Sequence, residues 1–232
     1  MNTAGEAMQV HVLHVAQGSM KNNNYLLVDP ATRSAVVIDP AWEIEKIEGA
    51  LASAGATLRG ILITHSHFDH MHLAEPLAQR HDCPIWMSRR EAKLCGFRAR
   101  HLVEIDDDAS WSVGNMSIHA IWTPGHTPGC VCYLVGNNLF TGDVLFAEGC
   151  GICPNVTAAH QMFESLQQLK ASIEPPTRIY PGHTYVKPPG QQFSELLRWN
   201  MYLQFEDRND FAAYRLRGGQ SMARWLTFGE GS

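Results

Sequence analysis

Four short segments of this chain carry side chains of the types that bind metal ions, and each segment reads as a turn. The segments span residues 64–70, 123–126, 141–143 and 181–183. They contain five imidazoles and two carboxylates, namely His65, His67, Asp69, His70, His126, Asp143 and His183. A single four-coordinate ion needs fewer ligands, so the set suits two ions with a carboxylate and a water between them. A paired site of this kind is suited to hydrolysis.

The first segment can supply ligands to two centres. Residues 60–64 are apolar and β-branched, which predicts a buried strand that ends just before His65. His65 and His67 are two apart, so they project to the same side of an extended backbone. Asp69 and His70 are adjacent and project in different directions, at the start of a helix predicted over residues 70–80.

The later ligands follow turn-forming residues. His126 and His183 each come after Pro-Gly, a tight turn that presents a side chain rigidly, and Asp143 comes after Thr-Gly. His72 lies two residues past the first segment, and we interpret it as a structural or supporting residue rather than a ligand. The remaining histidines are interpreted as surface or core residues: His11, His14, His81, His101, His119 and His160.

Strand and helix patterns alternate along the chain. Strands are predicted at residues 10–15, 25–28, 35–38, 60–64, 84–87, 117–122, 131–135, 139–140 and 178–180. Helices are predicted at residues 44–54, 70–80, 89–95, 158–173 and 191–205. Because each half of the chain ends in ligand loops, we expect two similar β/α halves packed face to face.

These motifs resemble the metallo-β-lactamase superfamily over residues 24–185, and within it the glyoxalase II branch, the hydroxyacylglutathione hydrolases. The branch-level match lies in Thr-Pro-Gly-His-Thr-Pro-Gly at 123–129, Phe-Thr-Gly-Asp-Val-Leu-Phe at 140–146, Gly-Cys-Gly at 149–151 and Pro-Gly-His-Thr-Tyr at 181–185. The resemblance implies an α/β (α+β) fold, the four-layer αββα sandwich. It also implies one metal on His65, His67 and His126, a second on Asp69, His70 and His183, and Asp143 as their bridge.

Two departures move the expected substrate away from glutathione. Ile152 stands where glyoxalase II tends to carry a basic residue, and only a short tail follows His183. Residues 149–169 and 202–217 are more similar to the zinc-dependent hydrolases of bacterial polyketide biosynthesis clusters, which are thought to cleave acyl thioesters from carrier proteins. Tyr185 is then expected to reach the substrate, Ile152 to line its pocket and Lys187 to meet a phosphate.

The late part of the chain allows two interpretations. Trp199, Tyr202 and Phe205 are expected to pack on the core, although they could instead line a pocket for an acyl chain. The basic group Arg215, Arg217 and Arg224 is expected to form a surface face, with an acidic carrier protein as the sharper alternative partner. We divide the 232 residues into a catalytic domain at 1–190 and a C-terminal helical extension at 191–232 packed on it.

Composition narrows the partners and the compartment. The net charge is −5 and there is no long basic run, so nucleic acid is not expected as a partner. The apolar runs are too short to span a bilayer, and no N-terminal signal segment is evident, so we predict a cytoplasmic protein without a membrane partner. The six cysteines are then reduced thiols. A redox or metal role for Cys150 and Cys153 is the alternative, and Cys130 and Cys132 are expected to be buried in a strand.

The leading prediction is a binuclear hydrolase of acyl thioesters. Asp69 would both bind a metal and orient the attacking water, and the thiolate, with a free-thiol pKa of about 8.5, could leave without a strong acid. Mixed His and Asp ligands favour zinc, and the same ligands accept iron or manganese. The alternatives are a hydroxyacylglutathione hydrolase, a persulfide dioxygenase with one iron that leaves Asp69 and His70 without metal, and a carrier-protein binding module without activity.

Overall fold

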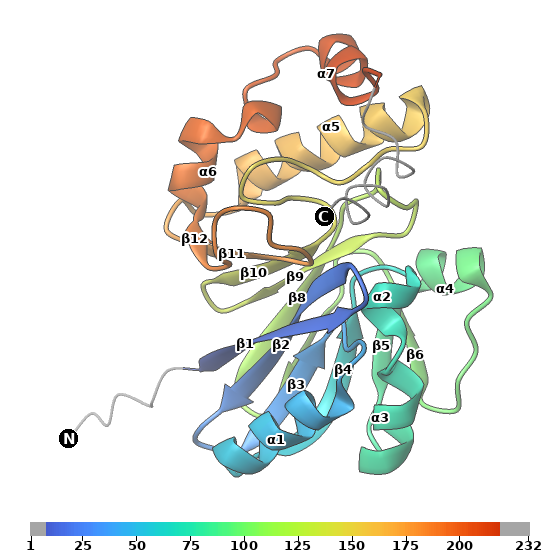
Figure 1. The fold of residues 1–232 in the computed structure, drawn as a ribbon, viewed down its shortest axis with the longest axis vertical. Coiled ribbons are helices and arrows are strands. Elements are labelled where there is room, and N and C mark those ends of the chain that lie inside the picture. The colour runs from blue at the N-terminus through green and yellow to red at the C-terminus, as the bar shows by residue number, and fades with distance from the viewer. Residues whose placement is uncertain (1–7, 219–232) are drawn as a thin grey trace.

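The structure is a computed structural model, and it describes residues 8–218. Two six-stranded sheets lie face to face, and helices cover the outer side of each (Figure 1). Three apolar clusters fill the spaces: one between the sheets and one under each helical layer. The predicted α/β fold, a four-layer αββα sandwich, is confirmed.

The first sheet is built from the N-terminal half of the chain. Its strands, in spatial order, are β1 (Gln9–Gln17), β2 (Met20–Asp29), β3 (Ser34–Ile38), β4 (Thr57–Ile63), β5 (Ile85–Ser88) and β6 (Leu102–Ile105). Strands β1 to β3 pair antiparallel, and β3 to β6 pair parallel. Alternate residues point to opposite faces. Leu26 and Val28 therefore pack under α1 (Ile44–Ala54) and α3 (Ala74–His81), whereas Tyr25 and Leu27 pack between the sheets.

The second sheet comes from the C-terminal half. Its strands, in spatial order, are β12 (Gln191–Gln192), β11 (Arg178–Pro181), β10 (Asn138–Gly142), β9 (Val131–Val135), β8 (Met116–Trp122) and β7 (Ser110–Val113). The helices α5 (Val156–Ser172), α6 (Phe193–Trp199) and α7 (Arg208–Arg215) cover its outer face (Figure 1). The pair β10 and β11 is parallel, so the carboxyl ends of both strands meet at one edge, where two ligand segments begin.

Several predicted elements are confirmed almost to the residue. Helix α1 spans the predicted residues and ends at Gly55, which has the left-handed φ of 57° that glycine accepts readily. Helix α4 (Arg89–Cys95) also has the predicted bounds. Cys130 and Cys132 lie buried around β9 as predicted, and all six cysteines are free thiols.

The prediction of one helix over residues 70–80 is wrong. Two helices lie there, α2 (Phe68–Met71) and α3, and the chain turns between them at His72 and Leu73. The Leu73 N–H donates to the Pro40 carbonyl, 3.0 Å away, instead of continuing the helix. His72 supports this turn, because its Nδ1 accepts from the Trp42 N–H at 3.2 Å.

The prediction of one helix over residues 191–205 is also wrong. After β12, helix α6 ends at Trp199, Asn200 follows it, and a short 3-10 turn lies at Met201–Leu203. The Asn200 side chain donates to the carbonyls of Phe146 and Gly149, at 2.9 and 3.0 Å. These bonds hold Asn200 against a loop that is distant in the sequence, and the helix does not continue through it. Of the three aromatic residues expected in the core, Tyr202 and Phe205 pack there, but Trp199 is 67% exposed.

The C-terminal extension contributes to the core through α6 and α7. Phe193, Leu196 and Phe211 join the apolar cluster beneath α5, and the division at residue 190 stays a prediction. The predicted surface role of Arg215 is wrong, because that side chain is only 5% exposed and its Nε donates to the Gly151 carbonyl at 2.7 Å. Arg224 lies outside the described residues.

Three elements had no clear pattern in the sequence. Strands β6 and β7 lie at the edges of the two sheets, and α7 follows the 3-10 turn. Edge strands are half exposed and short, so their hydrophobic signal is weak. Within residues 8–218, no helix combines the length and the apolar character that crossing a membrane requires.

Candidate metal centre

Three histidines form what we call the first ligand group: His65, His67 and His126. The Nε2 atom of His65 lies 3.2 Å from Nδ1 of His67, and that atom lies 3.0 Å from Nε2 of His126. For metal–ligand bonds of about 2.1 Å, two ligands of a tetrahedral ion are separated by about 3.4 Å. The three nitrogens therefore have the spacing that a single tetrahedral ion requires.

Asp69, His70 and His183 form the second ligand group. The Oδ2 atom of Asp69 lies 3.6 Å from Nε2 of His70 and 3.5 Å from Nε2 of His183. These separations also match the edges of one coordination tetrahedron. These two groups coincide with the sets that the sequence resemblance implied, and His65 and His70 also form a third, overlapping set with Asp39.

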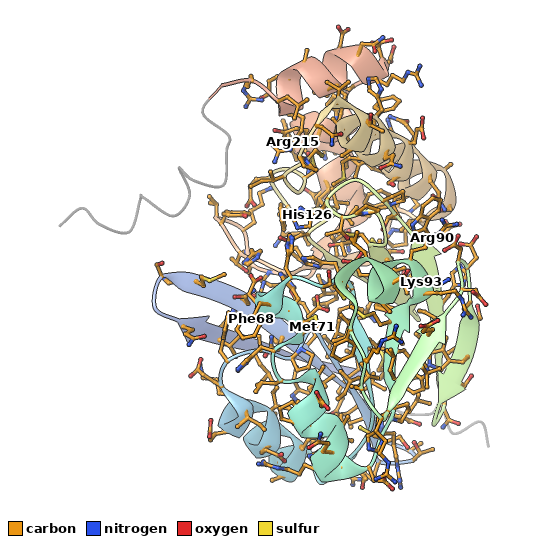
Figure 2. All side chains as sticks on the ribbon, turned by 90° about the vertical axis from the view of Figure 1, so that its right-hand side faces the viewer. Phe68, Met71, Arg90, Lys93, His126 and Arg215 are labelled. Carbon is orange, nitrogen blue, oxygen red and sulfur yellow. The ribbon has the colours of Figure 1, made fainter. Side chains whose placement is uncertain are left out.

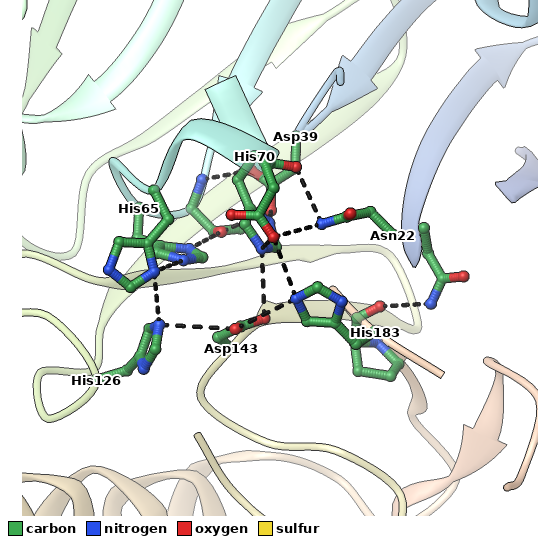
Figure 3. A network of polar contacts seen from close by, with 12 residues as sticks. Asn22, Asp39, His65, His70, His126, Asp143 and His183 are labelled. Carbon is green, nitrogen blue, oxygen red and sulfur yellow. Dashed lines mark hydrogen bonds and ion pairs between the residues drawn. The ribbon is translucent and has the colours of Figure 1, made fainter. Parts of the chain in front are cut away.

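Asp143 lies between the two groups (Figure 3). Its Oδ2 is 3.6 Å from Nε2 of His126 and 3.5 Å from Nε2 of His183, and its Oδ1 is 3.5 Å from Nε2 of His70. A single carboxylate therefore approaches imidazoles of both groups. This is the position from which it could bridge two ions.

Strand ends from both sheets bring the ligands together. His65 and His67 follow β4 of the first sheet, whereas Asp143 and His183 follow the parallel strands β10 and β11 of the second. The Val131 N–H at the start of β9 donates to the Thr64 carbonyl, 3.0 Å away, and so ties the two sheets together beside the site.

A second contact orients four of the five imidazoles. The outward Nδ1 atom bonds to a fixed oxygen in each case: His65 to Thr64 Oγ1 at 3.0 Å, His70 to Asp39 Oδ2 at 3.0 Å, His126 to the Ile152 carbonyl at 2.8 Å and His183 to the Lys21 carbonyl at 2.7 Å. A donor proton on Nδ1 leaves the lone pair of Nε2 free to face the site. In the neutral form of each of these rings, the proton is therefore held on Nδ1 and Nε2 is the atom that can bind metal.

Two polar residues that hold this centre were not among the predicted site residues. Asp39 accepts from the N–H and the hydroxyl of Thr64, at 2.8 and 2.6 Å, as well as from His70. Asn22 donates to the carboxylate of Asp69 at 2.9 Å and to its carbonyl at 3.0 Å. A signal for Asn22 exists, since residues 22–24 are three successive asparagines in a strand, where asparagine is disfavoured.

The electrostatic field of the site favours positive charge around Asp143. Burial lowers the pKa of His183, but the carboxylates of Asp143 and Asp69 and the Lys21 carbonyl together outweigh it, and the pKa is raised to about 9. The pKa of His70 is also raised, because Asp143 and Asp39 outweigh the effect of burial. In the first group, burial and the neighbouring His70 hold the pKa of His65 well below its usual value. His65 is therefore a neutral imidazole, the form that binds metal.

Two buried polar atoms at the centre lack a hydrogen-bond partner among the described residues: Nε2 of His70 and Oδ1 of Asp143. Such atoms are costly unless something satisfies them. Both are metal-ligating atom types, and they face each other at 3.5 Å. The residues present therefore fit metal ions at this place, and the side chains that would hold them are the first group, the second group and Asp143.

A cavity of about 460 Å3 opens onto the centre. Its wall includes Asp69 and Asp143 on the metal side and the predicted substrate residues Ile152 and Tyr185. Lys187 lies outside this lining, is exposed and donates its backbone N–H to Glu148 at 2.6 Å, so its proposed contact with a phosphate stays a prediction.

Gly182 leaves room for the centre, and replacing it is expected to weaken metal binding. A Cβ at this position would lie 2.5 Å from Cε1 of His70 and 2.6 Å from Oδ1 of Asp143. We expect Gly182→Ala to reduce metal affinity by about 10–100-fold, as displaced supporting contacts do. Calorimetric metal titration measures this. The control is Gly49→Ala in α1, where nothing lies within 4 Å of the new Cβ, and an unchanged affinity in Gly182→Ala would contradict the packing argument.

The fold and the donor set together are those of a metal-dependent hydrolase class. The chain belongs to the metallo-beta-lactamase superfamily, whose profile matches residues 20–183. The resemblance drawn from the sequence motifs is thereby confirmed, and the matched range includes all seven predicted ligands.

Individual relatives agree with this assignment. A Bacillus velezensis protein named probable polyketide biosynthesis zinc-dependent hydrolase BaeB is 43% identical over 213 residues, covering 91% of this chain and 95% of that protein. A hydroxyacylglutathione hydrolase of Pelagibacter ubique is 34% identical over 188 residues, covering 78% and 72%. Among solved structures, ETHE1 from Myxococcus xanthus has a TM-score of 0.80 at 27% identity, with 92% of each chain covered.

Proposed function

We propose that this protein is a binuclear metallohydrolase that cleaves an acyl thioester, from a carrier-protein or pantetheine-type thiol, in polyketide-type biosynthesis. The observation that carries the proposal is the position of Asp143 between two ligand groups in the wall of the cavity. The similarity to BaeB supports the biosynthetic setting and zinc as the metal. Iron and manganese would be accepted by the same ligands.

Two bound divalent ions would supply a water that ionises near neutral pH and would polarise the acyl carbonyl. Asp69 lies beside the cavity with its Oδ2 held by Asn22, so its carboxylate is placed to orient that water. Burial raises the pKa of Tyr185, and the negative charge of Asp143 raises it further. Its phenol therefore keeps its proton at neutral pH and is placed at the cavity wall to donate to a substrate oxygen.

The leaving group favours a thioester over an amide. A thiolate can depart without protonation, because the pKa of a free thiol is about 8.5. An amide nitrogen would need a proton donor at the moment of cleavage. The cavity wall supports an acyl substituent, since it carries the apolar side chains Met20, Phe68, Phe146 and Ile152.

A hydroxyacylglutathione hydrolase is the second candidate. Lys21 lines the cavity and could meet a carboxylate of glutathione, and the Pelagibacter ubique relative carries that name. Against it, Ile152 presents an apolar side chain where glyoxalase II tends to have a basic one. A persulfide dioxygenase with one iron would leave the second ligand group without a role. A binding module without activity would not need seven converging ligand side chains.

Thioester selectivity tests the proposal. We expect kcat/KM for acyl-pantetheine or acyl-carrier-protein thioesters to exceed that for S-lactoylglutathione by at least about tenfold, or about 1.4 kcal/mol. The assay uses metal-quantified protein and a panel of acyl-glutathione, acyl-CoA and acyl-carrier-protein substrates. The matched variant is Ile152→Arg, which places a basic side chain where glyoxalase II tends to carry one and should raise glutathione-thioester turnover. The variant keeps the backbone carbonyl of residue 152, so the contact that orients His126 is retained.

Two outcomes would redirect the assignment. Fast turnover of S-lactoylglutathione by the unmodified protein would restore glyoxalase II. About one iron per chain together with oxygen uptake would identify a dioxygenase, and would remove the hydrolase proposal altogether.

A further inference from the structure

A buried carboxylate outside the metal ligands links two of the ligand loops. Glu91 belongs to α4, which lies beside the centre in Figure 2, where Arg90 and Lys93 mark the helix. Its side chain is completely buried, with 0% exposure. Glutamate is almost never fully buried unless its charge is satisfied, so we expect hydrogen-bond donors around the Glu91 carboxylate.

Each oxygen of Glu91 serves a different loop. Oε1 accepts from the N–H and the hydroxyl of Ser66, at 2.8 and 2.7 Å. Oε2 accepts from the Thr127 hydroxyl at 2.8 Å and from the Gly129 N–H at 3.0 Å. A backbone N–H can only donate, so both oxygens must act as acceptors, as in an ionised carboxylate.

The partners of Glu91 flank all three histidines of the first ligand group. Ser66 lies between His65 and His67, and Thr127 directly follows His126. One side chain therefore spans the gap between the loop after β4 and the loop after β8. The helix is closely seated there, because a Cβ on Gly129 would lie 2.4 Å from the Glu91 backbone nitrogen.

We propose that Glu91 is a positioning residue that sets the spacing of these two loops, and with it the affinity of the first ligand group for its ion. The inference rests on the proposed function, since the group must hold an ion. It goes beyond that function because it assigns to Glu91 an effect on the metal affinity of the first ligand group alone. The second ligand group makes no contact with Glu91 among the hydrogen bonds and ion pairs of residues 8–218.

Glu91→Gln tests the role with almost no change in size. An amide offers one accepting oxygen and one NH2 group, so it can accept from the backbone N–H of only one loop. Its NH2 would face either the Ser66 N–H or the Gly129 N–H, donor against donor, and would release that loop. We expect the first group to bind its ion about 10–100-fold more weakly, as loss of supporting contacts does, with the second group unchanged.

Single-group backgrounds show which position is affected. His183→Ala cripples the second group, so Glu91→Gln added to it should weaken the remaining Zn2+ binding by the full factor. His126→Ala cripples the first group, so the same addition should leave the remaining Zn2+ affinity unchanged. Calorimetric titration of metal-stripped proteins with Zn2+ gives both values without any activity assay.

Ser88→Ala is the matched control, because Ser88 caps α4 by accepting from the Glu91 N–H at 3.4 Å and contacts neither loop through its hydroxyl. Equal weakening in Ser88→Ala, or equal weakening of both groups in Glu91→Gln, would overturn the inference. If Glu91→Gln fails to fold, Thr127→Val removes one donor to Oε2 and should still weaken only the first group. Unmodified protein that binds no Zn2+ would overturn the proposed function and this inference together.

Discussion

Asp143→Ala is expected to abolish metal binding and hydrolysis together. Asp143 approaches His126 of the first ligand group and both His70 and His183 of the second, at 3.5 to 3.6 Å. Burial disfavours its charge, but His183 and His70 hold the pKa of Asp143 well below its usual value, so it is a carboxylate at neutral pH. Without it, the first ligand group would contain only imidazoles, and the two groups would share no negatively charged ligand.

Metal analysis of the purified variant and its thioester turnover measure this result. The control is Asp210→Ala, which removes an exposed carboxylate from the first turn of α7 and should leave both quantities unchanged. A buried charge is also being removed, so circular dichroism must show that the variant is folded. A folded Asp143→Ala protein with full activity would reject the bridging role.

The parts of the fold that follow from local chemistry could be predicted from the sequence. Gly55 ends α1 in the left-handed conformation, which glycine adopts readily, so the residue type alone predicts this helix end. The two wrong helix predictions have long-range causes. Leu73 gives its N–H to Pro40, and Asn200 gives its amide to Phe146 and Gly149. These partners are all far along the chain from the residue at which the helix is interrupted. A local sequence pattern therefore could not indicate the interruption.

The same distinction applies to the centre. Its ligands could be predicted because metal binding needs particular side chains at turns. Two of the groups that orient them are main-chain carbonyls, those of Lys21 and Ile152, and any residue type supplies a carbonyl. Glu91 and Asp39 act through partners brought close only by the packed sheets. The sequence therefore indicates which side chains could bind metal. The fold determines how these side chains are oriented and how far apart their ligand atoms lie.

Asp69→Asn is expected to separate metal binding from catalysis. Asp69 contributes Oδ2 to the second ligand group, at 3.5 Å from Nε2 of His183, and Asn22 donates to that same oxygen at 2.9 Å. The Asn22 side chain donates at the Oδ2 position, so an asparagine at position 69 would place its amide oxygen there. Its NH2 group would then lie at the Oδ1 position. The variant would keep a ligand oxygen and lose the acceptor that orients the attacking water.

We therefore expect Asp69→Asn to lower kcat by about 10²–10⁴-fold, the range that a positioned acid or base contributes. The first ligand group should keep its ion, and KM should change little, because the apolar cavity wall is untouched. Steady-state kinetics with metal analysis of the same sample separates the two effects. Asn22→Ala removes the donor that fixes the amide, so combining it with Asp69→Asn should also weaken the metal. If kcat of Asp69→Asn stayed within twofold of the unmodified protein, another group would have to orient the water, and Asp69 would be a ligand alone.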